Sequence, residues 1–278
     1  MIPKSGNRFS DKIMHELGKS PLGMPMKART GFWLALGALI AIAAMPVLVT
    51  AQVAATPPAV AKPPAALPQD VAFGRFIALI RGHLLIGDEL ASQRQWDAAH
   101  PHFSFPTEEI YGIIREDLRT YKTPPFDGAL KALARTVKAH NAKQYPKARQ
   151  KVEDALAAAD AGLKARQANW PRFVVVVAIE TLKAAPDEYD DAVANGRIVR
   201  PIGYRTARGI ILQADRMIES VAGELEANNA AALSDMRAGF AQLKQSFASV
   251  IAPKQAVLDD SAVLGTVSRI ELAAAKIM

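Results

Sequence analysis

The sequence predicts an all-α fold, an antiparallel bundle of about six to eight helices. Beyond Asp70, apolar residues recur at positions i, i+3, i+4 and i+7 in nearly every segment, which is the spacing of a helix with one buried face. No alternating apolar pattern bounded by turn residues predicts a strand in this region. Aromatic residues make up only 6% of the chain while alanine is abundant, and this composition suits closely packed helices.

Five helices are predicted in the first half of this region. The first spans about 70–93, and a second begins near Trp96 and is kept short by Pro101 and Pro106. A third begins at Pro106, because proline suits a first helical turn, and ends before Pro124. The next two carry the following apolar positions: Leu130, Leu133 and Val137, and then Val152, Leu156, Ala159 and Leu163.

The second half begins with the most apolar run of the region, Phe173 to Leu182, which predicts a helix buried on most sides. Asn195-Gly196 is a turn signal that ends a helix. The clearest bundle seam alternates spacings of three and four residues. It consists of Leu233, Met236, Phe240, Leu243, Phe247 and Val250. A last helix carries Val263, Val267, Ile270, Ala274 and Ile277.

The chain begins with a leader. Residues 1–25 form a polar tail without apolar periodicity, which predicts a non-native upstream extension or a disordered tail. Residues 26–51 place Lys27 and Arg29 before an apolar run and end on the small-residue pattern of a signal peptidase site. They predict either a cleaved signal peptide or an uncleaved membrane anchor, since the apolar run Phe32–Val49 is at the lower limit for a spanning helix.

Residues 52–69 are rich in proline and alanine and predict a linker, so residues 70–278 form the helical-bundle domain. Either reading of the leader places this domain outside the cytoplasm, in the periplasm or anchored to the inner membrane facing it. Residues 1–51 carry six basic and two acidic residues, so removing their net +4 lowers the charge of the chain from +7 to +3. Nucleic-acid binding is therefore not expected, and the absence of cysteine excludes disulfides and thiolate metal sites.

The predicted first hairpin holds the candidate metal ligands. If the chain turns near Arg94, the helical rise places His102 and Glu108 within about one turn, ~5 Å, of His83. Adding Glu109 gives four candidate ligands for a divalent or iron ion, since imidazole and carboxylate groups suit such metals. Each also has a structural interpretation. The two glutamates would offset a helix dipole after Pro106, His83 would be a hydrogen-bonded core histidine, and His102 would not face the same way as His100 across Pro101.

Other charged residues predict buried pairs between helices rather than catalysis. These are Glu180, Arg208, Asp215, Arg269 and Glu271. No nucleophile elbow, glycine-rich phosphate loop or HExxH helix occurs in the sequence, so no enzyme is expected.

Three stretches follow one another in a characteristic order. They are LIGDELASQRQWDAAHPHFSFPTEEIYGIIRED (Leu85–Asp117), DEYDDAVANGRIVRPIGYRTARGIILQADRMIESV (Asp187–Val221) and ALSDMRAGFAQLKQSF (Ala232–Phe247). Together they resemble the imelysin-like family, exported helical proteins that include the iron-binding component of a bacterial ferrous-iron uptake system. The resemblance implies a helical bundle that handles iron outside the cytoplasm.

The chain departs from this family at its metal motif. The family's Gly-x-His-x-x-Glu motif should fall between Leu118 and Lys138, where the chain has no histidine. Only Glu108 or Glu109, in the acidic patch near Tyr111, corresponds to a family ligand. The resemblance therefore implies a divergent branch.

Two functional interpretations stay open. The first is a non-enzymatic periplasmic binding or accessory component, with metal uptake as its context. The second is a membrane-tethered interaction module, in which an uncleaved Phe32–Val49 helix and the linker present the bundle to an envelope protein partner. A chain that begins at Gln52 favours the first, and an intact leader in the membrane favours the second.

Overall fold

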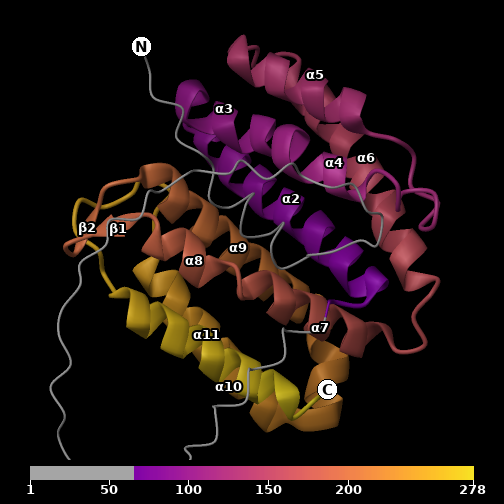
Figure 1. Ribbon diagram of the computed structural model, residues 1–278, viewed down its shortest axis with the longest axis vertical. Helices are drawn as coiled ribbons and strands as arrows, with labels where there is room; N and C mark the ends of the chain where they lie inside the picture. The colour runs from indigo at the N-terminus through magenta and orange to yellow at the C-terminus, as the bar shows by residue number, and fades with distance from the viewer. Residues whose placement is uncertain (1–65) are drawn as a thin grey trace, which may run out of the picture. The chain divides into compact units, whose positions relative to one another are not determined.

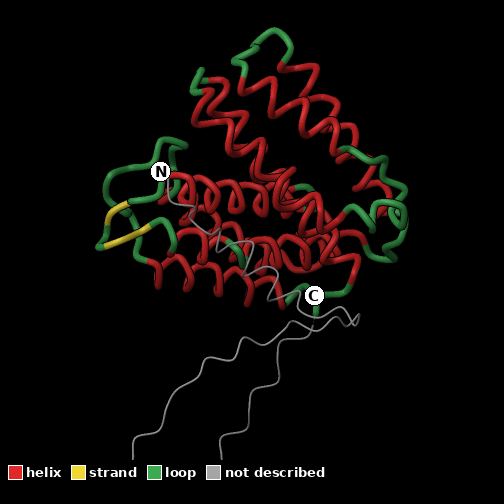
Figure 2. The backbone as a smooth tube through the Cα atoms, turned by 45° about the horizontal axis from the view of Figure 1, so that its top comes forward, coloured by secondary structure: helices red, strands yellow, loops and turns green. Residues whose placement is uncertain are grey.

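Helices account for nearly all regular structure in the computed structural model, which describes residues 66–278 (Figure 2). Within this range, eight helices have ten or more residues, so the all-α prediction is confirmed. None of the helices in residues 66–278 is long and apolar enough to cross a membrane. The predicted leader, 1–51, and most of the predicted linker lie outside the described residues.

The central helix is α2, Gln69–Ser92, which packs against α3, α6, α7 and α9 (Figure 1). Its first apolar residues are buried, as the sequence predicted, and so is most of the rest of the helix. The closest crossing is with α9, where Gly82 faces Gly209. A Cβ atom on Gly209 would lie 2.4 Å from the carbonyl oxygen of Gly82, so only glycine permits this approach.

The chain returns from α2 through α3, Trp96–Phe105, one π-helical turn η1, Pro106–Ile110, and the short α4, Tyr111–Ile114. The second helix is short, as predicted, and ends before Pro106, but Pro101 lies inside it, since a proline removes one backbone hydrogen bond without ending this packed helix. The helix predicted from Pro106 ends at Ile114, and Leu118 and Tyr121 reach the core from successive turns instead.

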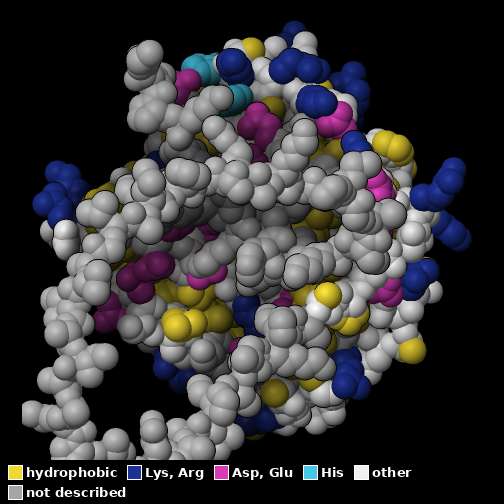
Figure 3. Space-filling view, in the orientation of Figure 1, with side chains coloured by type: hydrophobic (Ala, Val, Ile, Leu, Met, Phe, Trp, Pro, Cys, Tyr) yellow, Lys and Arg dark blue, Asp and Glu magenta, His cyan; other side chains and the backbone are white. Residues whose placement is uncertain are grey.

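The next helices, α5, Asp127–Lys138, and α6, Tyr145–Lys164, form an antiparallel pair. α5 is strongly amphipathic. Its buried face consists of Leu130, Leu133, Ala134 and Val137. Exposed basic residues cover the opposite face and the start of α6, and in Figure 3 Lys and Arg side chains gather over this part of the molecule. They are Lys131, Arg135, Lys138, Lys143 and Lys147.

The C-terminal half is a bundle of four long helices (Figure 1). They are α7, Trp170–Leu182; α9, Pro201–Glu219; α10, Ala222–Ser246; and α11, Asp260–Ala275. The short α8, Ala185–Asp190, packs against α9 and α11. In α10 the backbone kinks at Asn229, whose side-chain oxygen accepts a hydrogen bond from the N–H of Ala232 and restarts the helix. All six residues of the predicted seam are buried, but α10 ends at Ser246, so Phe247 and Val250 reach the core from the chain after the helix.

A small hairpin lies between α8 and α9, where β1, Val193–Ala194, pairs with β2, Arg197–Ile198. Asn195 and Gly196 both have positive φ, as a tight two-residue hairpin turn requires. The turn signal was correctly predicted, but it joins two short strands rather than ending a helix. The chain after α10 lies alongside, since the N–H of Ile198 donates to the carbonyl of Lys254.

Candidate functional site

A pair of buried histidines joins α2 to α3. His83 is 4% exposed and His102 is fully buried, and their Nδ1 atoms lie 3.3 Å apart. One ring must therefore carry its proton on Nδ1 while the other accepts it. Phe105 stacks on His83 with 4.7 Å between ring centroids. The hairpin geometry predicted from the sequence thus brings these two residues together.

Burial sets the charge state of the pair. Desolvation lowers the pKa of His83 to about 4. Desolvation, and then the nearby His83 and Arg205, lower the pKa of His102 well below its usual value. Both Nε2 atoms are buried and have no hydrogen-bond partner within residues 66–278. The two rings are therefore neutral near pH 7, and each keeps one unsatisfied nitrogen.

The predicted glutamates do not join the pair. Glu108 is exposed and Glu109 is half-buried in η1, and residues 66–278 contain no group of three or more histidine, aspartate or glutamate side chains that could hold a metal ion. The turn through η1 carries the chain away from the straight return path on which the four-residue site was predicted. Metal binding at the histidine pair itself stays a prediction.

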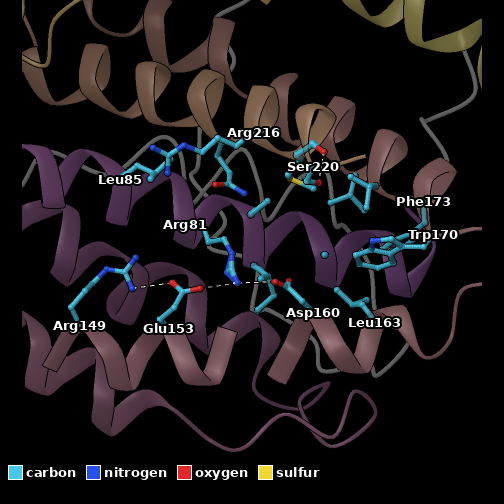
Figure 4. Close-up of a pocket in the computed structure, with 17 residues that line it drawn as sticks. Arg81, Leu85, Arg149, Glu153, Asp160, Leu163, Trp170, Phe173, Arg216 and Ser220 are labelled. Carbon is cyan, nitrogen blue, oxygen red and sulfur yellow. Dashed lines mark hydrogen bonds and ion pairs between the residues drawn. The ribbon is translucent and has the colours of Figure 1, made fainter. Parts of the chain in front are cut away.

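A pocket of about 340 Å³ lies over α2, between α6, α7 and α9 (Figure 4). Arg149 and Arg216 lie at one end of it and Trp170 and Phe173 at the other, with Arg81 between them. We call this cavity the four-helix pocket. It is of the size that small organic ligands occupy in proteins.

Ion pairs order the charged side of the four-helix pocket. The Nη2 atom of Arg81 lies 2.7 Å from a carboxylate oxygen of Asp160 and 3.3 Å from one of Glu153. Arg149 in turn contacts Glu153 at 3.0 Å and Asp88 at 3.1 Å. Desolvation raises the pKa of Asp160, Arg81 opposes this change, and the negative charge of Glu153 adds to it.

The opposite end of the four-helix pocket is apolar. Trp170 and Phe173 stack with ring centroids 5.6 Å apart. Leu163, Val174 and Val177 continue this wall. The pocket therefore combines an aromatic end with a basic end, which is an arrangement suited to an amphipathic ligand.

The sequence alone did not predict this pocket. One signal was present: Arg149, Glu153 and Asp160 follow the spacing of a single helix face and so form a charged stripe on α6. That stripe does not reveal its partner, since Arg81 lies 79 residues before Asp160. The pairing of α2 with α6 had to be known first.

The sequence predicted that Arg208 on α9 forms a buried pair, but its partner, Glu89, was not among the residues expected to pair. Arg208 is 7% exposed, its Nη1 atom contacts a carboxylate oxygen of Glu89 on α2, and its Nε atom donates to the carbonyl of Phe247 at 2.8 Å. This single side chain therefore ties α9 both to α2 and to the end of α10.

One region of the chain is similar to a known protein family. Residues 164–278 match the family model of the iron permease-associated 4-helix bundle domain. No curated protein and no solved structure matches the chain. The match fits the expected helical, iron-related kind of protein, but it does not support the resemblance to the imelysin-like family.

The matched region corresponds to a structural unit. It begins at the last residue of α6 and contains α7, α9, α10 and α11, the four long helices of the C-terminal bundle. The histidine pair precedes this region. The four-helix pocket spans its boundary, since α2 and α6 come before the region and α7 and α9 belong to it.

Proposed function

We propose that this protein is an exported, non-enzymatic accessory component of an iron transport system in the cell envelope. The observation that carries the proposal is the match of residues 164–278 to an iron permease-associated bundle, because in this chain those residues fold into four long helices packed together. The partner is then an iron transport protein of the envelope.

The leader supports the location. Lys27 and Arg29, the apolar run and the small-residue end at Ala51 have the order of an export signal. The match to an iron permease-associated domain supports iron as the cargo of the system. We therefore place the bundle in the periplasm, as a binding or accessory component.

The candidate sites favour binding over catalysis. The carboxylates of the four-helix pocket, Glu153 and Asp160, are engaged by arginines, which holds them in place. The buried His83 and His102 use their Nδ1 atoms on each other. Both arrangements fix side chains for recognition, and burial lowers the pKa of both histidines, which disfavours a role as a proton acceptor.

Affinity capture tests the partner. The full-length chain, tagged at its C-terminus and expressed in its own host, is cross-linked in intact cells and recovered from detergent extracts. An iron permease or another iron transport protein should be enriched over a control with a tagged, unrelated periplasmic protein. Recovery of the chain without any iron transport protein, in iron-poor and iron-rich medium alike, would contradict the proposal.

Fractionation of the same cells tests the location. A mature chain that begins at Gln52 in the periplasmic fraction is expected. Recovery of the intact leader in the membrane fraction would instead support the tethered interaction module. Retention of the full-length chain in the cytoplasm would refute both versions.

Calorimetric titration tests whether the protein itself carries the metal. The purified, metal-stripped chain is titrated with ferrous and ferric iron beside the His83→Ala/His102→Ala variant. Binding that is lost in the variant would make the histidine pair the metal site. Absence of binding would leave an accessory role in which the partner carries the iron.

A further inference from the structure

Exposed positive charges are concentrated over α5 and the start of α6. Between residues 128 and 152 the sequence has seven basic residues and no acidic one. The first five of these basic residues are exposed, and Lys and Arg side chains gather over this part of the molecule (Figure 3). We call these five residues the basic face: Lys131, Arg135, Lys138, Lys143 and Lys147.

Helix geometry explains the stripe of charge on α5. Lys131, Arg135 and Lys138 are spaced i, i+4 and i+7, so they project from one side of the helix. The apolar side of the same helix, which includes Leu133 and Val137, is buried in the core. α5 therefore presents its charged side to the solvent and has no free apolar side with which to enter a bilayer.

Most of the basic face is not neutralised by neighbouring carboxylates. Lys131 contacts Asp127 at 2.8 Å, and the nearby His140 contacts Asp97 at 3.0 Å. The other four cations form no ion pair with any residue in 66–278, and they are Arg135, Lys138, Lys143 and Lys147. Neighbouring like charges repel one another, so an anionic surface that approaches them is attracted.

The composition of the basic face favours a lipid surface over a protein partner. Protein interfaces have an apolar core and are depleted in lysine, whereas adsorption to anionic lipids needs only exposed cations. Four of the five cations are lysines. Within residues 66–278 the exposed large apolar side chains all lie in other parts of the chain, and they are Val199, Ile202, Ile251, Val257, Leu264 and Leu272. The basic face therefore lacks the apolar anchors of a protein interface.

We propose that the basic face binds the anionic phospholipid headgroups of a membrane surface. Each Lys or Arg near such a surface adds to the attraction, and mobile headgroups rearrange to meet cations on two different helices. The bundle is then held at the membrane through residues 131–147, which precede the matched region, 164–278. This goes beyond the proposed function, since it concerns how the bundle is held at the membrane and not which protein it meets there.

Sedimentation with lipid vesicles tests the proposal on the chain as purified from its host. One set of vesicles is an equimolar mixture of phosphatidylglycerol and phosphatidylcholine, and the other is phosphatidylcholine alone. We expect at least about tenfold tighter binding to the anionic vesicles. This preference should disappear as the NaCl concentration rises from about 0.05 M to about 0.5 M, because salt screens charges at an exposed surface.

A variant assigns the binding to the basic face. It combines Arg135→Gln, Lys138→Gln, Lys143→Gln and Lys147→Gln, which removes four exposed cations without touching the core. Binding to the anionic vesicles should weaken about tenfold or more.

A control variant removes the same number of exposed cations from the matched region. It combines Arg172→Gln, Arg197→Gln, Arg216→Gln and Lys254→Gln. Its affinity for the anionic vesicles should stay within about threefold of that of the unchanged chain, because these cations are not grouped on the basic face. The two variants and the unchanged chain have the same N-terminus, so any contribution of the leader is common to all three.

Three outcomes would overturn the proposal. The first is equal binding to the two kinds of vesicle, and the second is a basic-face variant that binds like the control variant. The third is tighter binding to a soluble poly-glutamate peptide than to the anionic vesicles at the same concentration of negative charge, which would make the basic face a docking surface for an acidic protein. Circular dichroism of both variants confirms that they are folded.

Discussion

His83 and His102 hold each other across the hairpin of α2 and α3, with 3.3 Å between their Nδ1 atoms. Both rings are buried, and both Nε2 atoms lack a partner in the described part of the chain. The charged group facing them is Arg205 of α9, which opposes protonation of His102. The pair is therefore stable only while both rings are neutral.

Acid should destabilise the protein through this pair. The folded pKa of His83, about 4, lies below the unfolded value of 6.5, so the unfolded state binds protons more readily between these values. Above about pH 6.5 both histidines are neutral in the folded and unfolded states, and the free energy of unfolding is unaffected by them. As the pH falls toward 4, the free energy of unfolding decreases by up to about 1.4 kcal/mol per pH unit for each histidine. Urea unfolding at pH 7 and pH 5 measures this loss.

The His83→Gln/His102→Gln variant should show a flatter dependence of stability on pH over this range. His140→Gln is the control, because His140 is exposed, pairs with the exposed Asp97 and stacks on Trp96 at the surface. A double variant with the same pH dependence as the unchanged protein would show that other groups govern the acid response.

Gly209→Ala should loosen the crossing of α2 and α9. The added methyl group would lie 2.4 Å from the carbonyl oxygen of Gly82, which is backbone and cannot rotate away. We expect a loss of about 1–3 kcal/mol in the free energy of unfolding. Gly223→Ala is the control: Gly223 lies in α10 with open space around it, and the change there should be neutral or slightly stabilising. Equal effects of the two substitutions would mean that the helices do not approach as closely as described.

Periodicity predicted the long helices because each buries one continuous face. The seam of α10 shows this most clearly, since its predicted residues from Leu233 to Leu243 are all buried. It failed where burial does not follow a helix: Leu118 and Tyr121 are buried from turns. The hairpin at 193–198 was not predicted, because strands of two residues are too short to show an alternating apolar pattern.

The candidate sites also differ in how far the sequence predicts them. His83 and His102 lie on one hairpin, so counting residues from the turn was enough to bring them together. Glu108 was misplaced, because the count assumed a straight helix where the chain forms a π-helical turn. The four-helix pocket combines side chains from four helices that are distant in sequence, and their relative packing cannot be counted from a single turn.

Phe240→Ala should be strongly destabilising. Phe240 is fully buried in the seam of α10, so truncation removes its apolar contacts and leaves a cavity. The expected loss is about 3–5 kcal/mol, measured by urea unfolding. Leu272→Ala on α11 is the control, because Leu272 is 68% exposed and its truncation should cost less than about 0.5 kcal/mol. A change near zero for Phe240→Ala would place the core of the bundle elsewhere.

Arg208→Ala should destabilise the protein, because it removes the contacts of this side chain with both α2 and the end of α10. Its loss leaves the carboxylate of Glu89 without its cation and the carbonyl of Phe247 without a donor. Because the Glu89 side chain is 33% exposed and water reaches it, we expect about 2–3 kcal/mol of destabilisation rather than the larger loss of a fully buried pair.

A double-mutant cycle separates the two contacts of Arg208. If the ion pair dominates, Glu89→Ala should cost little once Arg208 is absent, since the cation that it faced is gone. Arg237→Ala is the control, because Arg237 forms an exposed ion pair with Glu219 and its removal should change the unfolding midpoint little. Fully additive effects of Arg208→Ala and Glu89→Ala would show that Arg208 acts through the carbonyl of Phe247 alone, holding the end of α10 against α9.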